Sequence, residues 1–244
     1  MTVLNDKFEI EEIQKLNFWG LQFTIDPFQN MYCLLLEFLP NTTNRQKLIL
    51  TKCTLDGTAI QRYHDYEWGF RKDPVTGKLH TEAFRPQIRF QLNDRGQLYF
   101  AMTDLYEIQK YSADGKPLKK IIKKGKTRDL TPEERESFTS KSPNPRIVYD
   151  IPDHMPSIAD LFILENDYLL VVTFESVGDT LSGDVFDNTG RFLTTVKVPE
   201  YYRWDILDSP AKTNAVVKGG RFYTIEADED EDNFYVRRYK LLMK

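Results

Sequence analysis

The sequence predicts an all-β protein, a β-propeller of four-stranded antiparallel blades with one short helical insertion. Three observations favour this fold: aromatic residues make up 13% of the 244 residues, turn motifs that contain glycine recur, and short apolar runs surround each turn. Aromatic side chains suit strands, and a repeated four-stranded unit is typical of a propeller blade. We expect blade-like units over about 17–66, 85–125, 156–200 and 206–244, in a single propeller domain or the C-terminal portion of one.

The last two strands of each of the first three units form a hairpin. The segments 48–63, 107–122 and 183–198 each read as a strand, a tight turn and a second strand. Their turns carry Asp56-Gly57, Asp114-Gly115 and Asp187-Asn188-Thr189-Gly190. Glycine supplies the positive φ that a twisted hairpin turn requires, so these motifs predict hairpins.

Two further strands precede each hairpin. The segments 20–25 and 31–38, then 87–92 and 97–103, then 158–164 and 168–174 are short apolar runs separated by turns. The fourth unit shows three strands, over 214–217, 221–226 and 234–242. Each complete unit therefore has four strands in antiparallel order. The segment 7–16 resembles an outer strand with no blade before it, and we expect it to complete the last unit and close the ring.

Two insertions interrupt the repeat. The segment 67–84 has the turn signals Asp73-Pro74 and Thr76-Gly77 and reads as a loop. The segment 126–155 contains Thr131-Pro132-Glu133-Glu134. Threonine caps helices, proline is favoured at the first helical position, and acidic residues suit the first turn. We therefore predict a short helix over 132–139.

The four units resemble those of six-bladed β-propellers of the NHL and TolB-like kind, which are common among bacterial exported proteins. The resemblance runs from about 85 to 239 and includes TPEERESF (131–138), IPDHMPSIADLFI (151–163), DVFDNTGRFLTTVKVP (184–199) and YVRRYKL (235–241). It implies six blades where about four are visible, and an exported location if the natural chain is longer. It matches a repeat pattern, so it implies a fold and leaves the function open.

Composition limits the classes of partner. The net charge is −4 and charged residues make up 29%, so the basic footprint of a nucleic-acid binder is missing and we expect no nucleic-acid partner. The apolar runs are too short for a signal peptide or a membrane span. The two cysteines, Cys33 and Cys53, lie in apolar strand-like runs, where we expect them to be small buried hydrophobic residues.

The candidate ligand-binding residues lie near the predicted blade entrances. Arginine and aromatic side chains there can form a rim for an anionic or sugar-like ligand, and His154 sits in a turn that can face the central channel. These candidates are Arg89, His154, Tyr202, Arg203 and Trp204. The run 228–232 (DEDED) could bind calcium, but it lacks a calcium-loop pattern and reads as a solvated loop.

Two functions fit these observations. The first is a non-catalytic binding propeller that recognises a protein, peptide or glycan through its loop face, which the long insertions favour. The alternative is a metal-dependent hydrolase, lactonase or lyase with a site in the central channel. Such sites take single residues from several blades, so spacing along the chain does not reveal them. For the enzyme, the candidate residues are His154 and Asp160; no particular metal or cofactor is indicated.

Overall fold

The computed structural model describes residues 2–4, 10–13, 20–40, 45–124, 127–140, 146–176, 180–199, 215–227 and 234–240. The chain divides into two compact units. The first comprises residues 1–70 with 94–96, and the second comprises residues 71–93 with 97–244.

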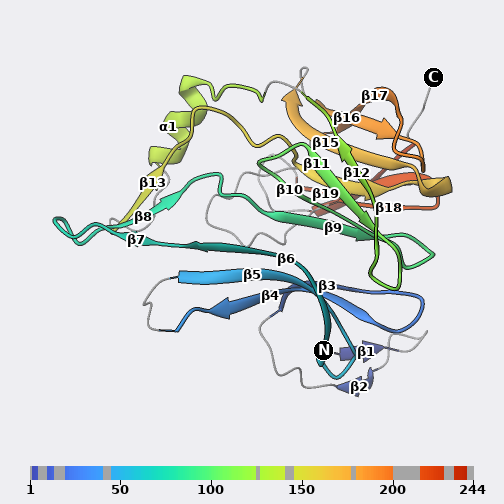
Figure 1. The fold of residues 1–244 in the computed structure, drawn as a ribbon. Helices are drawn as coiled ribbons and strands as arrows, with labels where there is room; N and C mark the ends of the chain where they lie inside the picture. Colours follow the sequence, from blue (N-terminus) through green and yellow to red (C-terminus); the bar gives the residue numbers. More distant parts are fainter. Residues whose placement is uncertain are drawn as a thin grey trace. The chain divides into compact units, whose positions relative to one another are not determined.

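The first unit contains a four-stranded antiparallel sheet in the order β3-β4-β5-β6 (Figure 1). Its strands are β3 (Gly20–Ile25), β4 (Met31–Phe38), β5 (Arg45–Cys53) and β6 (Ala59–Gly69). Met31, Cys33 and Cys53 are buried in one apolar cluster on this sheet, and both cysteines are free thiols, which confirms their predicted burial.

The N-terminal segment pairs with itself. Strand β1 (Thr2–Leu4) forms an antiparallel pair with β2 (Ile10–Ile13). The prediction that this segment completes the last sheet is therefore wrong for the described residues. A local hairpin needs a far shorter loop closure than pairing with a strand more than 200 residues away, and the entropic cost of closure grows with loop length.

The second unit contains three more sheets, in which neighbouring strands follow one another along the chain. The first two have four strands each, and the third has three described strands, all antiparallel. Their strands are β9 (Ile88–Leu92), β10 (Leu98–Met102), β11 (Glu107–Tyr111) and β12 (Pro117–Ile122); β14 (Asp160–Ile163), β15 (Leu169–Ser176), β16 (Thr180–Phe186) and β17 (Phe192–Pro199); and β18 (Ala215–Lys218), β19 (Arg221–Ala227) and β20 (Phe234–Lys240). This strand order is that of a propeller blade and confirms the predicted fold class.

Apolar layers join these three sheets in sequence order. One cluster includes Ile108 of β11 and Leu161 of β14, and a second includes Phe162 of β14 and Phe222 of β19. The rings of Phe162 and Phe222 meet edge to face, with centroids 5.1 Å apart. Because alternate residues of a strand face opposite sides, Leu161 and Phe162 bury the middle sheet on both faces.

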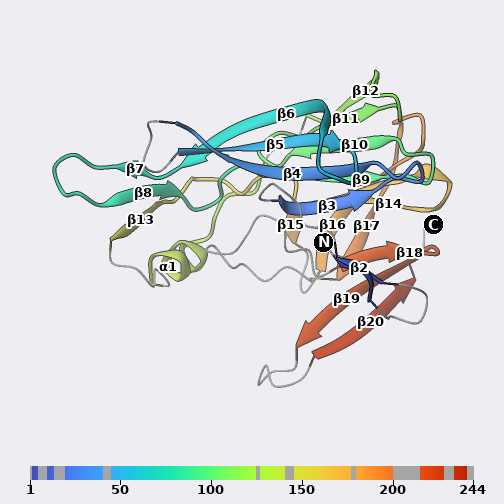
Figure 2. The same ribbon diagram turned by 90° about the horizontal axis from the view of Figure 1, so that it is seen from below.

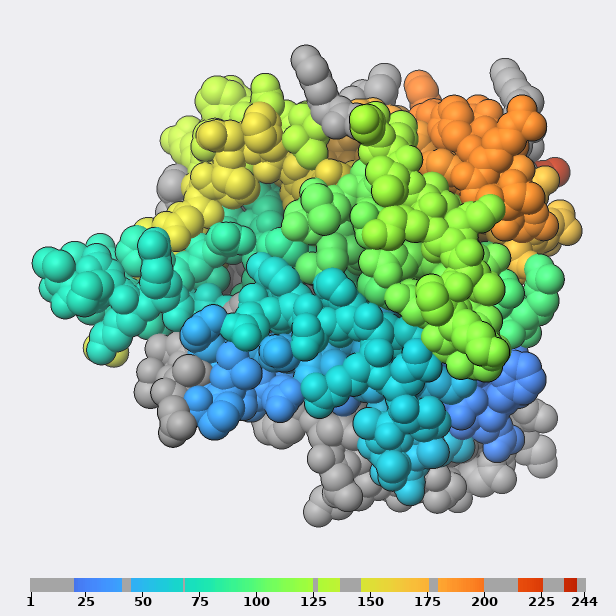
Figure 3. Space-filling model, viewed as in Figure 1, coloured from blue at the N-terminus to red at the C-terminus, as the bar shows by residue number. Residues whose placement is uncertain are grey.

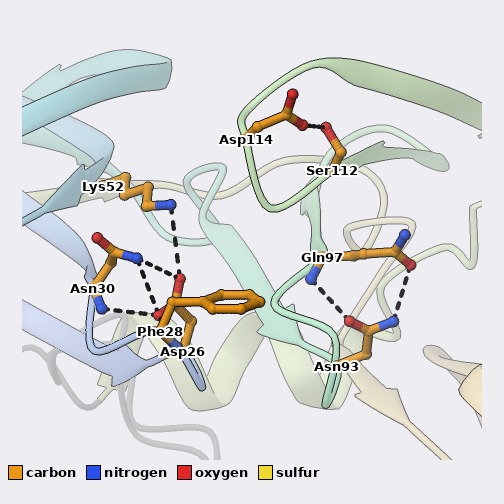
Figure 4. Close-up of polar contacts among 8 residues, drawn as sticks. All are labelled: Asp26, Phe28, Asn30, Lys52, Asn93, Gln97, Ser112 and Asp114. Carbon is orange, nitrogen blue, oxygen red and sulfur yellow. Dashed lines mark hydrogen bonds and ion pairs between the residues drawn. The ribbon is translucent and has the colours of Figure 1, made fainter.

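The turns between strands use one repeated hydrogen-bond pattern, part of which Figure 4 shows. In the β11–β12 turn, Gly115 has a φ of 82°, and its N–H donates to the Ser112 carbonyl. The Ser112 hydroxyl accepts a 3.0 Å hydrogen bond from the N–H of Lys116. Equivalent bonds go to the side chains of Thr54 and Asp187 in the other two hairpins and to those of Asp26 and Asn93 in the β3–β4 and β9–β10 turns.

The two insertions form a sheet together, in the order β13-β8-β7. Strand β7 (Arg71–Lys72) pairs antiparallel with β8 (Leu79–Glu82), and β13 (Ile147–Asp150) pairs parallel with β8. Figure 2 shows the three strands side by side, with helix α1 next to β13. The prediction of a loop over 67–84 is therefore wrong, because β8 finds its partner in a strand more than 60 residues along the chain.

The predicted helix is confirmed as α1 (Pro132–Ser140). Thr131 caps it: the N–H of Glu134 donates to the Thr131 hydroxyl at 3.2 Å, and the Glu134 carboxylate accepts the N–H of Thr131 at 2.8 Å. This reciprocal pair is a capping box, which satisfies two backbone donors at the start of the helix. A short 3₁₀ turn, η1 (Glu165–Asp167), joins β14 to β15.

Candidate ligand-binding pocket beside the insertion sheet

An open pocket of about 440 Å³ lies in the second unit, where both insertions meet the β10–β11 turn. The first insertion and the residues that follow it supply one wall, and the end of β13 and the turn after it supply another. In Figure 3 the segment after β13, in yellow, lies against the yellow-green helix. The lining residues are Glu82, Phe84, Pro86, Asp104, Thr127, Asp150, Ile151, Pro152, His154, Met155 and Pro156.

The floor of this pocket is apolar and belongs to the core. Met155 is buried within the cluster that fills the space between the second and third sheets of the unit, and Phe84 and Ile151 pack against that cluster. The backbone N–H of Met155 also donates to the Arg128 carbonyl at 2.8 Å. Side chains held by a close-packed core keep one position, so the floor is formed before any ligand arrives.

Three carboxylates line the pocket. Asp150 is held by the first insertion, since its oxygens lie 3.0 Å from Nδ1 of His80 and 3.4 Å from the Arg71 guanidinium. Glu82 and Asp104 are exposed, and neither carboxylate has a hydrogen-bond or ion-pair partner among the described residues. The pocket therefore presents two exposed carboxylates that no described residue pairs.

His154 lines the pocket, as part of the turn in which the sequence analysis placed it. Its Nδ1 lies 2.6 Å from Oδ1 of Asp129, and the two residues also form an isolated antiparallel bridge. The next backbone bond, from the Leu130 N–H to the Asp153 carbonyl, measures 3.1 Å. These contacts tie the start of the second insertion to its end.

A partly exposed ion pair links the start of the helix to the segment before it, beside the pocket. The Arg128 guanidinium donates two hydrogen bonds to the Glu134 carboxylate, at 2.6 and 2.9 Å, and its Nε donates to the Phe174 carbonyl at 3.0 Å. The Arg128 guanidinium holds the pKa of Glu134 below its usual range. Arg128 is thus a link between the second insertion, the helix and strand β15.

A second, smaller cavity of about 40 Å³ shares Thr127 and Pro156 with the pocket. Tyr106 and Lys123 line it, and both bond to the buried carboxylate of Asp184 at 2.6 Å. Thr195 donates a third hydrogen bond to Asp184 at 2.9 Å. Burial, together with the bond to Asp184, raises the pKa of the Tyr106 hydroxyl, which therefore stays protonated as a donor.

The other predicted site residues lie elsewhere. Arg89 is only 4% exposed and donates from Nε to the Ala159 carbonyl at 3.2 Å, so it is buried between two sheets and does not lie on an exposed rim. Asp160 is also buried, and its carboxylate accepts its neighbour's N–H, that of Leu161. Tyr202, Arg203, Trp204 and the run 228–232 fall outside the described residues. A ligand-binding role for Arg89 stays a prediction.

Glu82, Asp104 and Asp150 were not among the site residues predicted from the sequence. A local pattern does not bring these residues together, because β8 and β13 are distant in sequence and Asp104 sits in the β10–β11 turn. The available signal was the pair of insertions itself, since loops that interrupt a regular scaffold often carry function.

Two features are absent from the described residues: a metal-binding cluster and a membrane-spanning helix. No three histidine, cysteine, aspartate or glutamate side chains in the described ranges are grouped so that they could hold a metal ion. No helix in the part of the chain that the structure describes is long and apolar enough to cross a membrane. The metal-dependent alternative stays a prediction.

No protein-family model matches the chain, and no curated protein matches its sequence. Among solved structures, similarity extends to a puromycin hydrolase (TM-score 0.42, 11% identity, 96% of this chain and 29% of that one). It also extends to a virginiamycin B lyase from Staphylococcus aureus, with a TM-score of 0.36 and 11% identity over 96% of this chain and 74% of that one. A third similar structure is Hsv2 from Kluyveromyces lactis, with a TM-score of 0.36 and 12% identity over 98% of this chain and 78% of that one. The chain spans less than a third of the hydrolase's length. At such low TM-scores, none of these similarities indicates a function for this chain.

Proposed function

We propose that this chain is a non-catalytic binding module that recognises a protein or peptide segment through the pocket beside its insertion sheet. The observation that carries the proposal is the open pocket of about 440 Å³. Ligand sites are commonly concave, a few hundred Å³ in volume, and lined by apolar side chains with a small number of polar groups. Six of the eleven residues that line this pocket are apolar, and the other five are polar or charged.

The way the pocket is built supports the proposal. Its walls come from two segments that interrupt the blade repeat, while its floor packs on the core of the β14–β17 sheet. A site on loops that a rigid scaffold positions is the usual arrangement for recognition. The apolar floor favours an inserted amino-acid side chain over a glycan. We take the sheets to be blades of one propeller domain, of the NHL and TolB-like kind that the sequence resembles.

A peptide library displayed on phage tests this function. Peptides are selected on the wild-type protein, and their affinities are then measured by fluorescence anisotropy on a variant with the pocket obstructed, Pro152→Trp. The control is Val75→Trp, at the tip of the β7–β8 hairpin, where Val75 is 90% exposed and does not line the pocket.

The proposal predicts that Pro152→Trp weakens the selected peptides at least about tenfold, which is a loss of about 1.4 kcal/mol, while Val75→Trp leaves them unchanged. Thermal melts of both variants verify that they are folded. Selection of no peptides, or of peptides that bind the folded Pro152→Trp protein as tightly as wild type, would overturn the proposed function.

A further inference from the structure

We infer that the pocket selects a basic side chain, of lysine or arginine, on the bound segment; the inference rests on the proposed function. Its first support is charge. Glu82 and Asp104 face the pocket without a partner among the described residues, and Asp150 adds a third carboxylate. A cation that reaches one of these carboxylates gains charge-assisted hydrogen bonds, which are stronger than neutral ones.

Three basic side chains near the pocket are already engaged in contacts of their own. Arg71 and His80 both contact Asp150, and the Arg128 guanidinium is taken up by Glu134 and the Phe174 carbonyl. An anionic ligand would have to displace these contacts and also approach Glu82 and Asp104. The electrostatics of the pocket thus favour a cation and oppose an anion.

The second support is the arrangement of charged and apolar groups in the pocket. The carboxylates are exposed, whereas the floor beneath them is formed by Phe84, Ile151 and the buried Met155. Lysine and arginine have the same division, with an aliphatic stem that packs on apolar surface and a charged end that stays in a polar setting. A small inorganic cation would leave the apolar floor unused.

The carboxylates of Glu82 and Asp104 are carried by two different elements of the fold. Glu82 is the last residue of β8, paired with Asp150 in the parallel ladder, and Asp104 lies in the β10–β11 turn, whose carbonyl accepts the Ser157 hydroxyl at 3.1 Å. Both backbone positions are held by these contacts. Only the two side chains then need to be ordered when a cation binds, which limits the entropic cost of binding.

Three labelled peptides test the inference: Gly-Leu-Lys-Leu-Gly and the same peptide with norleucine or glutamate in the centre. Norleucine keeps the aliphatic stem and removes the charge. Binding is measured by fluorescence anisotropy on the wild type, on Glu82→Gln and Asp104→Asn, and on the control Glu133→Gln, an exposed acid of α1 that does not line the pocket.

We expect the lysine peptide to bind at least about tenfold more tightly than the norleucine peptide, and each pocket variant to remove most of that difference. Glu133→Gln should change nothing, and 0.5 M salt should reduce the difference, because exposed charges are screened. Equal binding of the lysine and norleucine peptides, tighter binding of the glutamate peptide, or no binding of the lysine peptide would overturn the inference.

The two proposals fail in different ways. If the library yields peptides that depend on the pocket but contain no basic residue, the choice of ligand is wrong and the pocket still binds. If no selected peptide depends on Pro152, the proposed function itself is wrong.

Discussion

The stacked sheets and the insertion sheet of the second unit are held together by different forces. Strands β14–β17 are antiparallel neighbours along the chain, and β14, β15 and β16 are buried on both faces by apolar side chains. The sheet of β7, β8 and β13 joins distant segments, and its described side-chain links are the exposed contacts of Asp150 with His80 and Arg71. Hydrophobic burial contributes far more than exposed ion pairs, so the first region should set the stability of the unit and the second should adapt to ligand.

The largest expected effect comes from the apolar layer. Phe162 is 2% exposed and meets Phe222, so Phe162→Ala removes a ring and leaves a cavity between two sheets. We expect a loss of about 3–5 kcal/mol in the free energy of unfolding, measured with urea. A loss below about 1 kcal/mol would show that the two sheets do not share a packed layer.

A smaller loss in the free energy of unfolding should follow when the hydrogen-bond network around Asp184 is disrupted. Asp184→Ala leaves the Tyr106 hydroxyl and the Lys123 ammonium without their carboxylate. We expect a loss of roughly 1–3 kcal/mol, since unsatisfied buried polar groups are costly. Tyr106→Phe, which removes only one donor, is the matched control and should cost less. Equal costs for the two variants would contradict the network.

The Arg128–Glu134 pair predicts a pH effect in the helix. The pKa of Glu134 is lowered in the folded protein, so its contribution to stability is fully present above the unfolded value, about 4.3, and is lost as pH falls through the lower folded value. The protection factors of the α1 amides, which are exchange rates corrected for the intrinsic pH dependence, should therefore fall at acidic pH in the wild type. In Glu134→Gln this pH dependence should be reduced, and an unchanged profile would rule out the pair as its cause.

The smallest effect on stability should come from the insertion sheet. His80→Ala removes one of the contacts of Asp150, on a surface where both residues are partly exposed. We expect the free energy of global unfolding to fall by less than about 1 kcal/mol. Hydrogen exchange should become faster only in β8 and β13. A global loss as large as that of Phe162→Ala would remove the distinction between the two regions.

The same distinction explains what the sequence could predict. The hairpin turns around Gly115 and Gly190 and the capped start of α1 depend on residues within a few positions, so their motifs predicted them. Burial of alternate residues also follows from strand periodicity. Arg89 was expected at an exposed rim. Its side chain instead points from β9 into the interface with the next sheet, and this direction depends on the register of β9 with β10.

The pocket could be predicted only in part. His154 was a candidate because of its turn, and it lines the pocket. Glu82 and Asp104 gave no local signal, since their neighbourhood depends on the parallel pairing of β8 with β13. Tertiary packing decides which distant segments pair, and the spacing of apolar residues along the chain carries no information about it.

The parallel pairing of the two insertions is the claim on which the pocket depends, and a crosslink tests it most directly. In the register of β8 and β13, His80 lies opposite Val148. Cysteines at these two positions should form a disulfide under mild oxidation, detected by mass spectrometry, whereas cysteines at Leu79 and Tyr149, which are out of register, should react much more slowly. Rapid crosslinking of the first pair alone would support the account. Failure of the first pair in folded protein, or equal crosslinking of both pairs, would contradict it.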